Sequence, residues 1–360
     1  MKALLALEDG KVFSGYSFGS AGEAQGEVVF NTSLTGYQEA LTDPSYRGQI
    51  VTMTYPLVGN YGVNLQDVES SRLQVGAFVV RENSPGFSNY RATGSLETYL
   101  KENGIVALER IDTRALTKHI REKGAMRGVI STEDLDPSSL IEKARKVLPM
   151  VGQDLVQKVT TSTTYTWSDQ GRFTILVVDC GVKYNILREL ARRNCRVVVC
   201  PANISLAEIE NIKPQGVLFP NGPGDPAAVP YVVDLARAVM KKYPTFGICF
   251  GHQILCRALG AETFKLKFGH RGDNHPVKEL SSGQVFITSQ NHGFVVAADT
   301  LPPEEVEVTY INLNDHTLEG IKHRYLPLFS VQFHPEARPG PHDTNYLFDY
   351  FVKMVEDNLA

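Results

Sequence analysis

The chain has 360 residues, of which 42% are hydrophobic and 21% are charged, and its formal net charge at pH 7 is −4. A chain of this length can bury two or three hydrophobic cores. Residues 1–150 carry 16 Lys and Arg against 18 Asp and Glu, so neither half has the excess of basic residues that nucleic-acid binding requires. No apolar run approaches the length of a membrane span. We therefore expect a protein that binds neither nucleic acid nor a membrane.

The cysteines indicate a reducing compartment. All five lie in the second half of the chain and none pairs with another as Cys-x-x-Cys, which argues against a zinc site and a disulfide framework. The apolar stretch 1–7 is too short for a secretion signal and is closed by Glu8 and Asp9. We expect a cytoplasmic protein with no bound metal.

The first half is predicted to form a smaller α/β domain over residues 1–150. Apolar runs between turns rich in Gly, Asn, Asp and Pro predict strands, and apolar patterns with a period near 3.6 predict helices. The expected strands are 3–7, 27–32, 49–54 and 74–80, and the expected helices are 94–102, 112–121 and 138–147. Residues 151–172 lose this periodicity and become rich in Thr and Ser, which predicts an interdomain connection, although Thr and Tyr also favour a strand there.

Residues 173–360 are predicted to form a doubly wound open α/β sheet. Expected strands at 173–179, 196–200 and 216–219 alternate with expected helices at 185–193, from 205 onwards and at 231–242. This alternation implies parallel strands with right-handed crossovers, and ligands of such sheets bind beyond the carboxyl ends of the strands. Further strands are expected at 284–288, 294–298, 306–311 and 328–331, before a final amphipathic helix at 344–355.

A motif of glycines around a cysteine stands in the middle of this domain. Residues 245–260 indicate a short strand, a sharp turn through Gly247 and Gly251 with Cys249 between them, and a helix. Gly-x-Cys-x-Gly is the cysteine counterpart of the Gly-x-Ser-x-Gly nucleophile elbow, in which flanking glycines make room for a strained backbone. The N-terminus of the helix favours a thiolate. The alternative is a buried structural cysteine between turn glycines.

Gln332-Phe-His-Pro-Glu336 contains a base and a group that can orient it. His334 and Glu336 are two residues apart, so both side chains leave the same face of an extended segment. A carboxylate beside an imidazole favours the charged ring, and an imidazolium stabilises a neighbouring thiolate. The alternative is a surface turn at Pro335.

Pro220-Asn-Gly-Pro-Gly-Asp-Pro226 follows an expected strand directly. It predicts a rigid turn that exposes backbone N–H groups, and such donors stabilise a developing oxyanion. A plain strand-to-helix loop is the alternative. The chain has no Gly-x-x-x-x-Gly-Lys-Ser/Thr phosphate loop and no Gly-x-Gly-x-x-Gly dinucleotide motif. We therefore expect no nucleotide site and no cofactor in this chain.

The elbow cysteine, the His-x-Glu pair and the glycine loop together resemble the triad of the class I glutamine amidotransferases. Gly247-Ile-Cys-Phe-Gly-His-Gln253 is similar to that family's nucleophile motif. The chain as a whole resembles the small-chain family of carbamoyl-phosphate synthase. This second resemblance rests on residues 30–39, 43–46, 51–56 and 59–62 in the first half and on residues 179–185, 269–276 and 289–294 in the second. Other class I amidotransferases lack the first domain.

The resemblance implies hydrolysis of glutamine to glutamate and ammonia through a γ-glutamyl thioester on Cys249. His334 would be the proton shuttle and Glu336 its orienting partner. The backbone N–H groups of Phe250 and Gly222 would form the oxyanion hole. The residues that would hold glutamine are Ser45, Lys183, Gly222, Gly224, Phe250, Gln253, Asn291, Gly293 and Phe294.

The resemblance also implies a partner. Synthesis of carbamoyl phosphate, for pyrimidine or arginine biosynthesis, needs ATP with Mg²⁺ and bicarbonate. A large synthetase chain would bind them and receive ammonia from this chain, with the first domain docking that chain and Ser45 reaching into the glutaminase site.

Three other functions are weighed against this one. The first domain argues against a stand-alone γ-glutamyl cysteine hydrolase and against an amidotransferase chain of guanylate or anthranilate synthesis. The complete set of Cys249, His334 and Glu336 argues against a non-catalytic regulatory partner.

Overall fold

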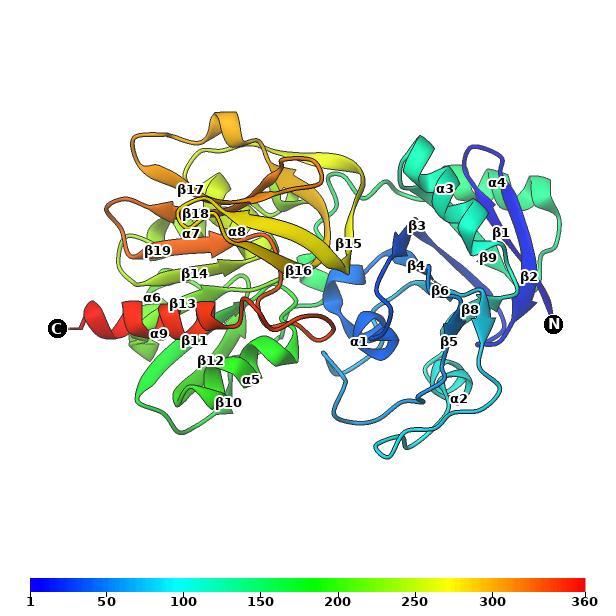
Figure 1. Cartoon of the computed structure of the whole chain (residues 1–360), viewed down its shortest axis with the longest axis horizontal. Coiled ribbons are helices and arrows are strands. Elements are labelled where there is room, and N and C mark those ends of the chain that lie inside the picture. The colour runs from blue at the N-terminus through cyan, green and yellow to red at the C-terminus, as the bar shows by residue number, and fades with distance from the viewer. Residues whose placement is uncertain (360) are drawn as a thin grey trace. The chain divides into compact units, whose positions relative to one another are not determined.

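The computed structural model describes residues 1–359, which divide into two units (Figure 1). The first unit comprises Met1–Met150 with Lys267–Arg271, and the second comprises Val151–Leu266 with the described residues from Gly272 onwards. Residues 151–172, expected as a connection, are counted with the second unit. They contain the 3-10 turn η2 (Val156–Lys158) and strand β10 (Tyr165–Ser168).

A closed barrel with the strand order β1-β2-β8-β6-β4-β3-β9 forms the centre of the first unit. Its strands are β1 (Lys2–Leu7), β2 (Val12–Ser17), β3 (Glu23–Asn31), β4 (Gln49–Met53), β6 (Ala77–Val79), β8 (Val106–Glu109) and β9 (Met126–Ser131). Strands β5 (Leu57–Val58) and β7 (Glu82–Asn83) form a separate pair. The helices are α1 (Tyr37–Thr42), η1 (Pro44–Tyr46), α2 (Leu96–Glu102), α3 (Thr113–Lys123) and α4 (Pro137–Lys146).

Apolar side chains on the two faces of the barrel strands pack into two separate hydrophobic cores. Val28 and Ile50 pack in one core with Leu116 of α3, while their neighbours Val29 and Val51 pack in another core with residues of α1 and α2. Successive side chains of a strand point to opposite faces, so a barrel wall can be apolar on both sides. The structure confirms the expected strands near 3–7, 27–32, 49–54 and 74–80 with shifted ends, and adds β2, β8 and β9.

The second unit is built on a sheet of ten strands in the order β10-β12-β11-β13-β14-β19-β18-β17-β15-β16. The remaining strands are β11 (Phe173–Asp179), β12 (Cys195–Pro201), β13 (Gly216–Phe219), β14 (Thr245–Ile248), β15 (Thr263–Glu279), β16 (Val285–Val296), β17 (Val306–Asn312), β18 (Leu318–His323) and β19 (Leu328–Val331). The run β12-β11-β13-β14-β19 is parallel, and the pairs β10/β12, β18/β19, β17/β18 and β15/β17 are antiparallel. The predicted doubly wound sheet is therefore present with antiparallel extensions.

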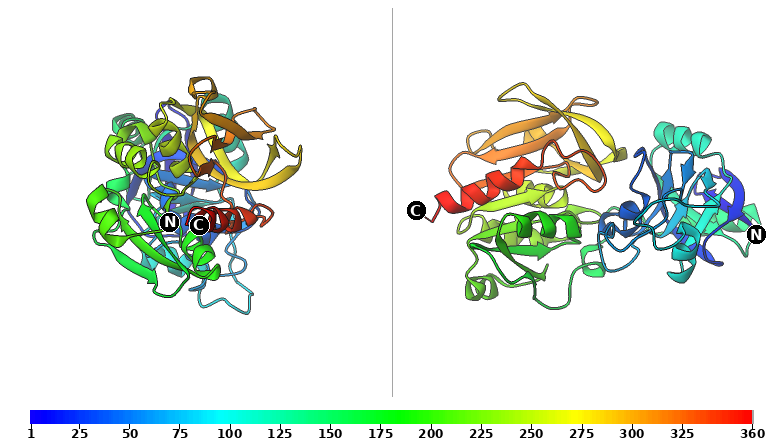
Figure 2. Two further views of the ribbon diagram at one scale, coloured as in Figure 1. Left: turned by 90° about the vertical axis from the view of Figure 1, so that its left-hand side faces the viewer. Right: turned by 60° about the horizontal axis from the view of Figure 1, so that its bottom comes forward.

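Helices cover both faces of the parallel strands. The helices of this unit are α5 (Tyr184–Arg192), α6 (Leu206–Ile212), η3 (Pro226–Ala228), α7 (Pro230–Val239), α8 (Phe250–Ala258), η4 (Ala298–Thr300) and α9 (Tyr346–Asp357). Residues of α6, α7 and α8 share one hydrophobic core with the strands, and residues of α5 and α9 share the other. Figure 2 shows α9, in red, beside the strands of this sheet. This layering leaves the carboxyl edge of the parallel strands open to carry polar residues.

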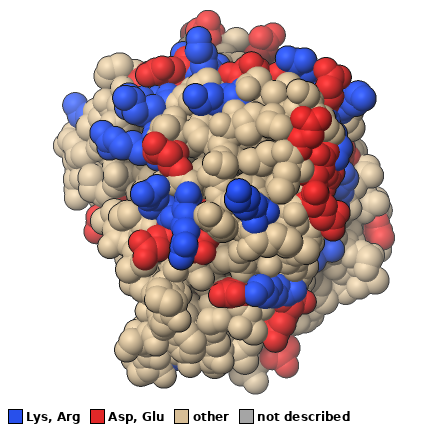
Figure 3. Space-filling model, turned by 90° about the vertical axis from the view of Figure 1, so that its right-hand side faces the viewer, with Lys and Arg blue, Asp and Glu red and all other residues tan. Residues whose placement is uncertain are grey.

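The surface carries charges of both signs, and the described helices do not have the character of membrane spans. Lys and Arg side chains are interspersed with Asp and Glu on the face drawn in Figure 3. Among residues 1–359, every helix is too short or too polar to cross a membrane.

Candidate active site

Cys249 lies at the sharp turn between β14 and α8. Its backbone has φ 54 and ψ −102, a region that is strained for a residue with a side chain. Its N–H donates to the Val331 carbonyl (2.8 Å) and its carbonyl accepts from the Gln253 N–H (3.2 Å), so both sides of the turn are held. The predicted elbow is present, and Cys249 stands at the N-cap of α8 with 1% of its surface exposed.

The glycines of the motif allow a close approach of backbones. The Gly251 N–H donates to the Pro220 carbonyl (2.9 Å), which joins the start of α8 to the loop after β13. A Cβ at Gly251 would lie 1.9 Å from the Phe219 carbonyl oxygen, closer than any real contact.

We therefore expect Gly251→Ala to lower the free energy of unfolding by about 3 kcal/mol or more, because backbone must move to accept the methyl group. Urea unfolding followed by circular dichroism measures the change. Gly86→Ala is the control, since a Cβ there meets nothing within 4 Å. Equal stability of the two variants would contradict this packing.

Parallel pairing of β14 and β19 brings His334 to the same edge of the sheet as Cys249. Strands β14 and β19 are neighbours in register, with Ile248 opposite Val331. Cys249 and the segment 332–336 therefore leave the same edge of the sheet. Of this segment, the His334 N–H donates to the Ser289 carbonyl of β16 (2.9 Å), which fixes the main chain beside the elbow.

His334, Glu336 and Lys183 form a buried series of charged groups. His334 Nδ1 lies 2.6 Å from Glu336 Oε1, and the same oxygen accepts a hydrogen bond from Lys183 Nζ (2.9 Å). The Lys183 ammonium also donates to the Ala337 carbonyl (2.8 Å). The side chains of Glu336 and Lys183 are 0% and 3% exposed. The attraction of the two cationic neighbours offsets the desolvation cost of burying the Glu336 carboxylate. The contact with Nδ1 also orients the His334 ring, so that Nε2 points away from Glu336.

Opposing effects set the charges of this series. Burial alone would lower the pKa of His334, but the charges of Glu336 and Cys249 outweigh it and raise the pKa to about 10. Burial would raise the pKa of Glu336, but Lys183 and His334 outweigh it and lower the pKa to about 2. The ring is therefore an imidazolium at neutral pH, and in general an imidazolium favours the thiolate form of a neighbouring cysteine. His334 Nε2 is buried and has no hydrogen-bond partner within residues 1–359, so it is available to a substrate.

The raised pKa of His334 predicts a pH-dependent stability. Histidine in an unfolded chain titrates near about 6.5. The ring therefore stabilises the fold fully below that pH, and its contribution is lost as the pH rises through the folded value of about 10. We expect the difference in free energy of unfolding between the wild type and His334→Asn to shrink steadily over this range. Urea unfolding at a series of pH values measures it, and a difference that does not change with pH would contradict the assignment.

The expected oxyanion donors lie next to each other. A Cβ at Gly222 would lie 3.1 Å from Phe250 Cδ1 and 2.5 Å from the Cys180 carbonyl oxygen, so the glycine loop packs directly on the start of α8. Phe250 is the first residue of α8, and a first-turn N–H has no partner within its own helix.

The structure brings most of the other predicted residues to the same edge of the second unit. Cys249 Sγ lies 3.6 Å from the Asn291 carbonyl oxygen, and Gln253 Nε2 donates to the Phe294 carbonyl (2.7 Å). Gly293 lies between them on β16, and Gly224 (φ 84) packs against Leu155. Ser45 lies in the first unit, in η1, where its N–H donates to Asp43 Oδ1 (2.9 Å). It is the one predicted glutamine ligand outside the second unit.

Comparisons with known proteins extend over the whole chain. Residues 5–130 match the family model "Carbamoyl-phosphate synthase small chain, CPSase domain", and residues 176–354 match "Glutamine amidotransferase class-I". The carbamoyl phosphate synthase small chain of Syntrophotalea carbinolica is 53% identical and covers 99% of both chains. That of Aquifex aeolicus is also 53% identical and covers 98% of this chain and 99% of its own.

The chain belongs to the carbamoyl-phosphate synthase small-chain family. The small chain of Bacillus caldolyticus is 51% identical and covers 99% of this chain and 97% of its own. The resemblance stated from the motifs is confirmed, and so is the fold class. A small chain of this family is a glutaminase of the class I type.

Several residues at the family site had no predicted role. Asn221 Oδ1 accepts from the Lys183 N–H (3.0 Å), and Asn185 Nδ2 donates to the Glu336 carbonyl (2.5 Å). Both residues lie inside motifs that carried the resemblance, so the sequence pointed to these segments. It did not reveal their hydrogen-bond partners, because those are remote in sequence. Lys183 was expected to hold glutamine. Its ammonium instead contacts the Glu336 carboxylate and the Ala337 carbonyl, and so helps to hold Glu336 beside His334. A contact between Lys183 and glutamine stays a prediction.

Proposed function

We propose that this chain is the glutaminase of a glutamine-dependent carbamoyl-phosphate synthase, with Cys249, His334 and Glu336 as its catalytic residues. The observation that carries the proposal is the buried series Lys183–Glu336–His334 beside an elbow cysteine, in a chain related over its full length to this family. The chemistry below follows from the positions of these groups.

Cys249 Sγ attacks the side-chain amide carbon of glutamine. The oxyanion that forms receives hydrogen bonds from the N–H groups of Phe250 and Gly222. His334 Nε2 gives its proton to the leaving nitrogen, so ammonia departs and a γ-glutamyl thioester remains. The now neutral ring takes a proton from a water molecule, which hydrolyses the thioester to glutamate and returns the thiolate–imidazolium pair.

Recognition of glutamine is assigned to the surrounding polar groups. Asn291, Gly293 and Phe294 on β16 and Gln253 on α8 adjoin the nucleophile, and Gly222 and Gly224 supply the loop opposite. A free amino acid has both an ammonium and a carboxylate, so it needs polar partners at its α-carbon end. We assign Ser45 and Lys183 to this set on the motif match.

The partner is a large synthetase chain that binds ATP with Mg²⁺ and bicarbonate and consumes the ammonia. The first unit is assigned to docking this chain, because it carries no comparable acid–base series of its own among the contacts described. This chain itself needs no cofactor for the thioester chemistry. A reducing cytoplasm suits its five free, buried cysteines.

Glutamate release from glutamine tests the proposal. The purified chain is assayed alone and with the large chain, ATP and bicarbonate. We expect release to be stimulated by the complete mixture. Full turnover without the partner would instead identify a free hydrolase, and no turnover in either condition would identify a regulatory protein that has kept the fold.

A further inference from the structure

Strand β16 forms a wall of the proposed glutaminase site through its main chain. The carbonyl groups of Ser289, Asn291 and Phe294 face the His334 N–H, Cys249 Sγ and Gln253 Nε2 respectively. The position of this main chain therefore sets the space around the nucleophile. Side chains of the same strand enter a buried polar network with β17 and β18, and none of them has a role in the chemistry described above.

The orientation of the Gln290 amide follows from its neighbour Thr288. The Thr288 hydroxyl donates its single proton to the His275 carbonyl (2.9 Å), so its oxygen can only accept from Gln290 (3.2 Å). The NH₂ end of Gln290 therefore faces Thr288 and Glu319 Oε2, to which it also donates (2.9 Å). The carbonyl oxygen Oε1 is left facing His292.

The orientation of Asn312 fixes the state of Glu319 by the same reasoning. Asn312 Oδ1 accepts from the Asn314 N–H (2.9 Å), so its NH₂ end faces Glu319 Oε1 and donates to it (2.8 Å). Both carboxylate oxygens of Glu319 thus accept hydrogen bonds from amide groups. Hydrogen bonds to the charged form favour that form, so these two donors favour an ionised Glu319 carboxylate although the residue is 0% exposed.

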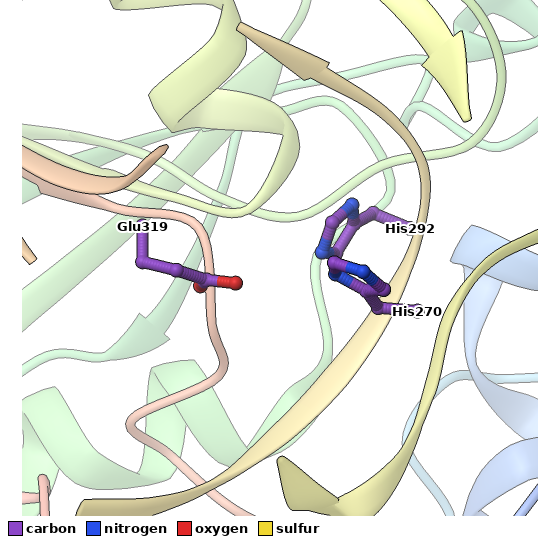
Figure 4. Close-up of side chains that lie close together, drawn as sticks. All are labelled: His270, His292 and Glu319. Atoms are coloured by element: carbon purple, nitrogen blue, oxygen red, sulfur yellow. The ribbon is translucent and has the colours of Figure 1, made fainter. Parts of the chain in front are cut away.

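Both ring nitrogens of His292 face acceptors. Its Nε2 lies 2.9 Å from Gln290 Oε1, and its Nδ1 lies 2.9 Å from the Phe294 carbonyl oxygen. A carbonyl oxygen only accepts, so both ring nitrogens must carry protons. Figure 4 shows the Glu319 carboxylate pointing towards the side on which the rings of both His292 and His270 lie. A buried cation is stable only with a counter-ion, and Glu319 supplies it through the Gln290 amide.

We propose that Glu319 is a positioning residue of the glutaminase site, which keeps His292 doubly protonated through Gln290. The charged ring holds the Phe294 carbonyl, which also receives Gln253, and so fixes the β16 main chain against Cys249. A metal ion would need a free lone pair on His292, and this arrangement leaves none. The chemistry of the network is therefore that of a buried ion pair.

Nitrogen NMR of the chain labelled at its histidines tests the protonation directly. We expect His292 to keep two protonated nitrogens at about pH 8.5, which is two units above the usual pKa of histidine. The resonances are assigned by their loss in His292→Asn. A singly protonated His292 ring in the wild type would overturn the proposal. This measurement is made on the wild-type chain, so it does not depend on whether a Glu319 variant folds. In Glu319→Gln the ring should become neutral, with one protonated nitrogen.

Exchanging the two side chains separates charge from packing. Gln290→Glu combined with Glu319→Gln keeps the volume and moves the carboxylate next to His292, so both protons should return; the Thr288 hydroxyl turns its proton from the His275 carbonyl to the new carboxylate. With the large chain bound, we expect the KM for glutamine to rise roughly tenfold in Glu319→Gln and to return to within about threefold of the wild type in the double variant. Ammonia-dependent synthesis should be unchanged in both.

The control is Glu307→Gln, an exposed carboxylate on β17, which should change neither the spectrum nor the KM. A double variant as impaired as Glu319→Gln, or still carrying a neutral His292, would overturn the proposal. The kinetic measurements rest on the proposed function, but the NMR measurements do not, so failure of one is distinguishable from failure of the other.

Discussion

Cys249→Ser is expected to lower glutamine-dependent synthesis of carbamoyl phosphate by about 10⁴-fold or more. A serine hydroxyl at this position is not ionised by the neighbouring imidazolium, so the attack on the glutamine amide is lost. Synthesis from added ammonia by the assembled complex should survive, because we propose that the large chain binds ATP and bicarbonate. Both activities are measured on the same complex by the rate of carbamoyl phosphate formation.

The matched control for this variant is Cys256→Ser. Cys256 lies on the same helix and is equally buried, next to His252, and burial raises the pKa of its thiol. Its replacement should leave glutamine-dependent synthesis close to that of the wild type. Loss of the ammonia-dependent reaction in Cys249→Ser would contradict the proposed division of work between the two chains.

Glu336→Gln is the second substitution with a large expected effect. It removes the acceptor that orients His334 and leaves the buried Lys183 ammonium without its carboxylate. We expect the rate constant for glutamate release to fall by roughly 10³–10⁴-fold. We also expect the free energy of unfolding to fall by about 3–5 kcal/mol, because an unpaired charge remains buried. Steady-state kinetics and urea unfolding measure the two effects.

The double variant Lys183→Met with Glu336→Gln distinguishes these two consequences. Replacing both members of a buried ion pair by neutral groups removes the unpaired charge, so stability should largely return. Activity should stay low, because His334 still lacks a charged partner. Recovery of activity in the double variant would show that Glu336 acts only on stability, and would contradict its role in orienting the base.

The second unit was predicted well from its sequence. Continuous apolar strands such as Phe173–Asp179 and Gly216–Phe219 are buried on both faces, and their lengths and spacing are the direct mark of a parallel sheet. The grouping of Cys249, His334 and Glu336, proposed as the catalytic residues, was predicted for the same reason. Its members follow the ends of neighbouring strands β14 and β19, so local sequence and topology agree on their position.

The barrel of the first unit was only partly predicted. Strands β2 and β9 each contain a glycine, Gly15 and Gly128, which weakens the strand pattern. The structure explains them: a Cβ at Gly15 would lie 2.5 Å from the Glu109 carbonyl oxygen, and one at Gly128 would lie 2.5 Å from Val28 Cγ2. These glycines are required by contacts between strands, which no local pattern reveals.

The network around Glu319 was missed for a similar reason. Its members Thr288, Gln290, Asn312 and Glu319 lie on three strands, and of these residues only Thr288 falls within a strand expected from the sequence. Only the register of the sheet shows that they meet in the interior. Sequence motifs therefore locate the proposed nucleophile and its proposed base, while the groups that fix their surroundings depend on tertiary pairing.

Selective alkylation tests the central claim, that Cys249 is the nucleophile, most directly. Burial raises the pKa of the Cys195 thiol to about 11 and raises those of Cys180, Cys200 and Cys256, so these thiols stay protonated at neutral pH. A chloroketone analogue of glutamine is added in equal amount to the folded complex, and the modified cysteine is located by mass spectrometry.

We predict modification of Cys249 alone, with loss of glutamate release and protection by glutamine. Modification of another cysteine with loss of activity, or full inactivation of glutamate release with Cys249 unmodified, would contradict the account.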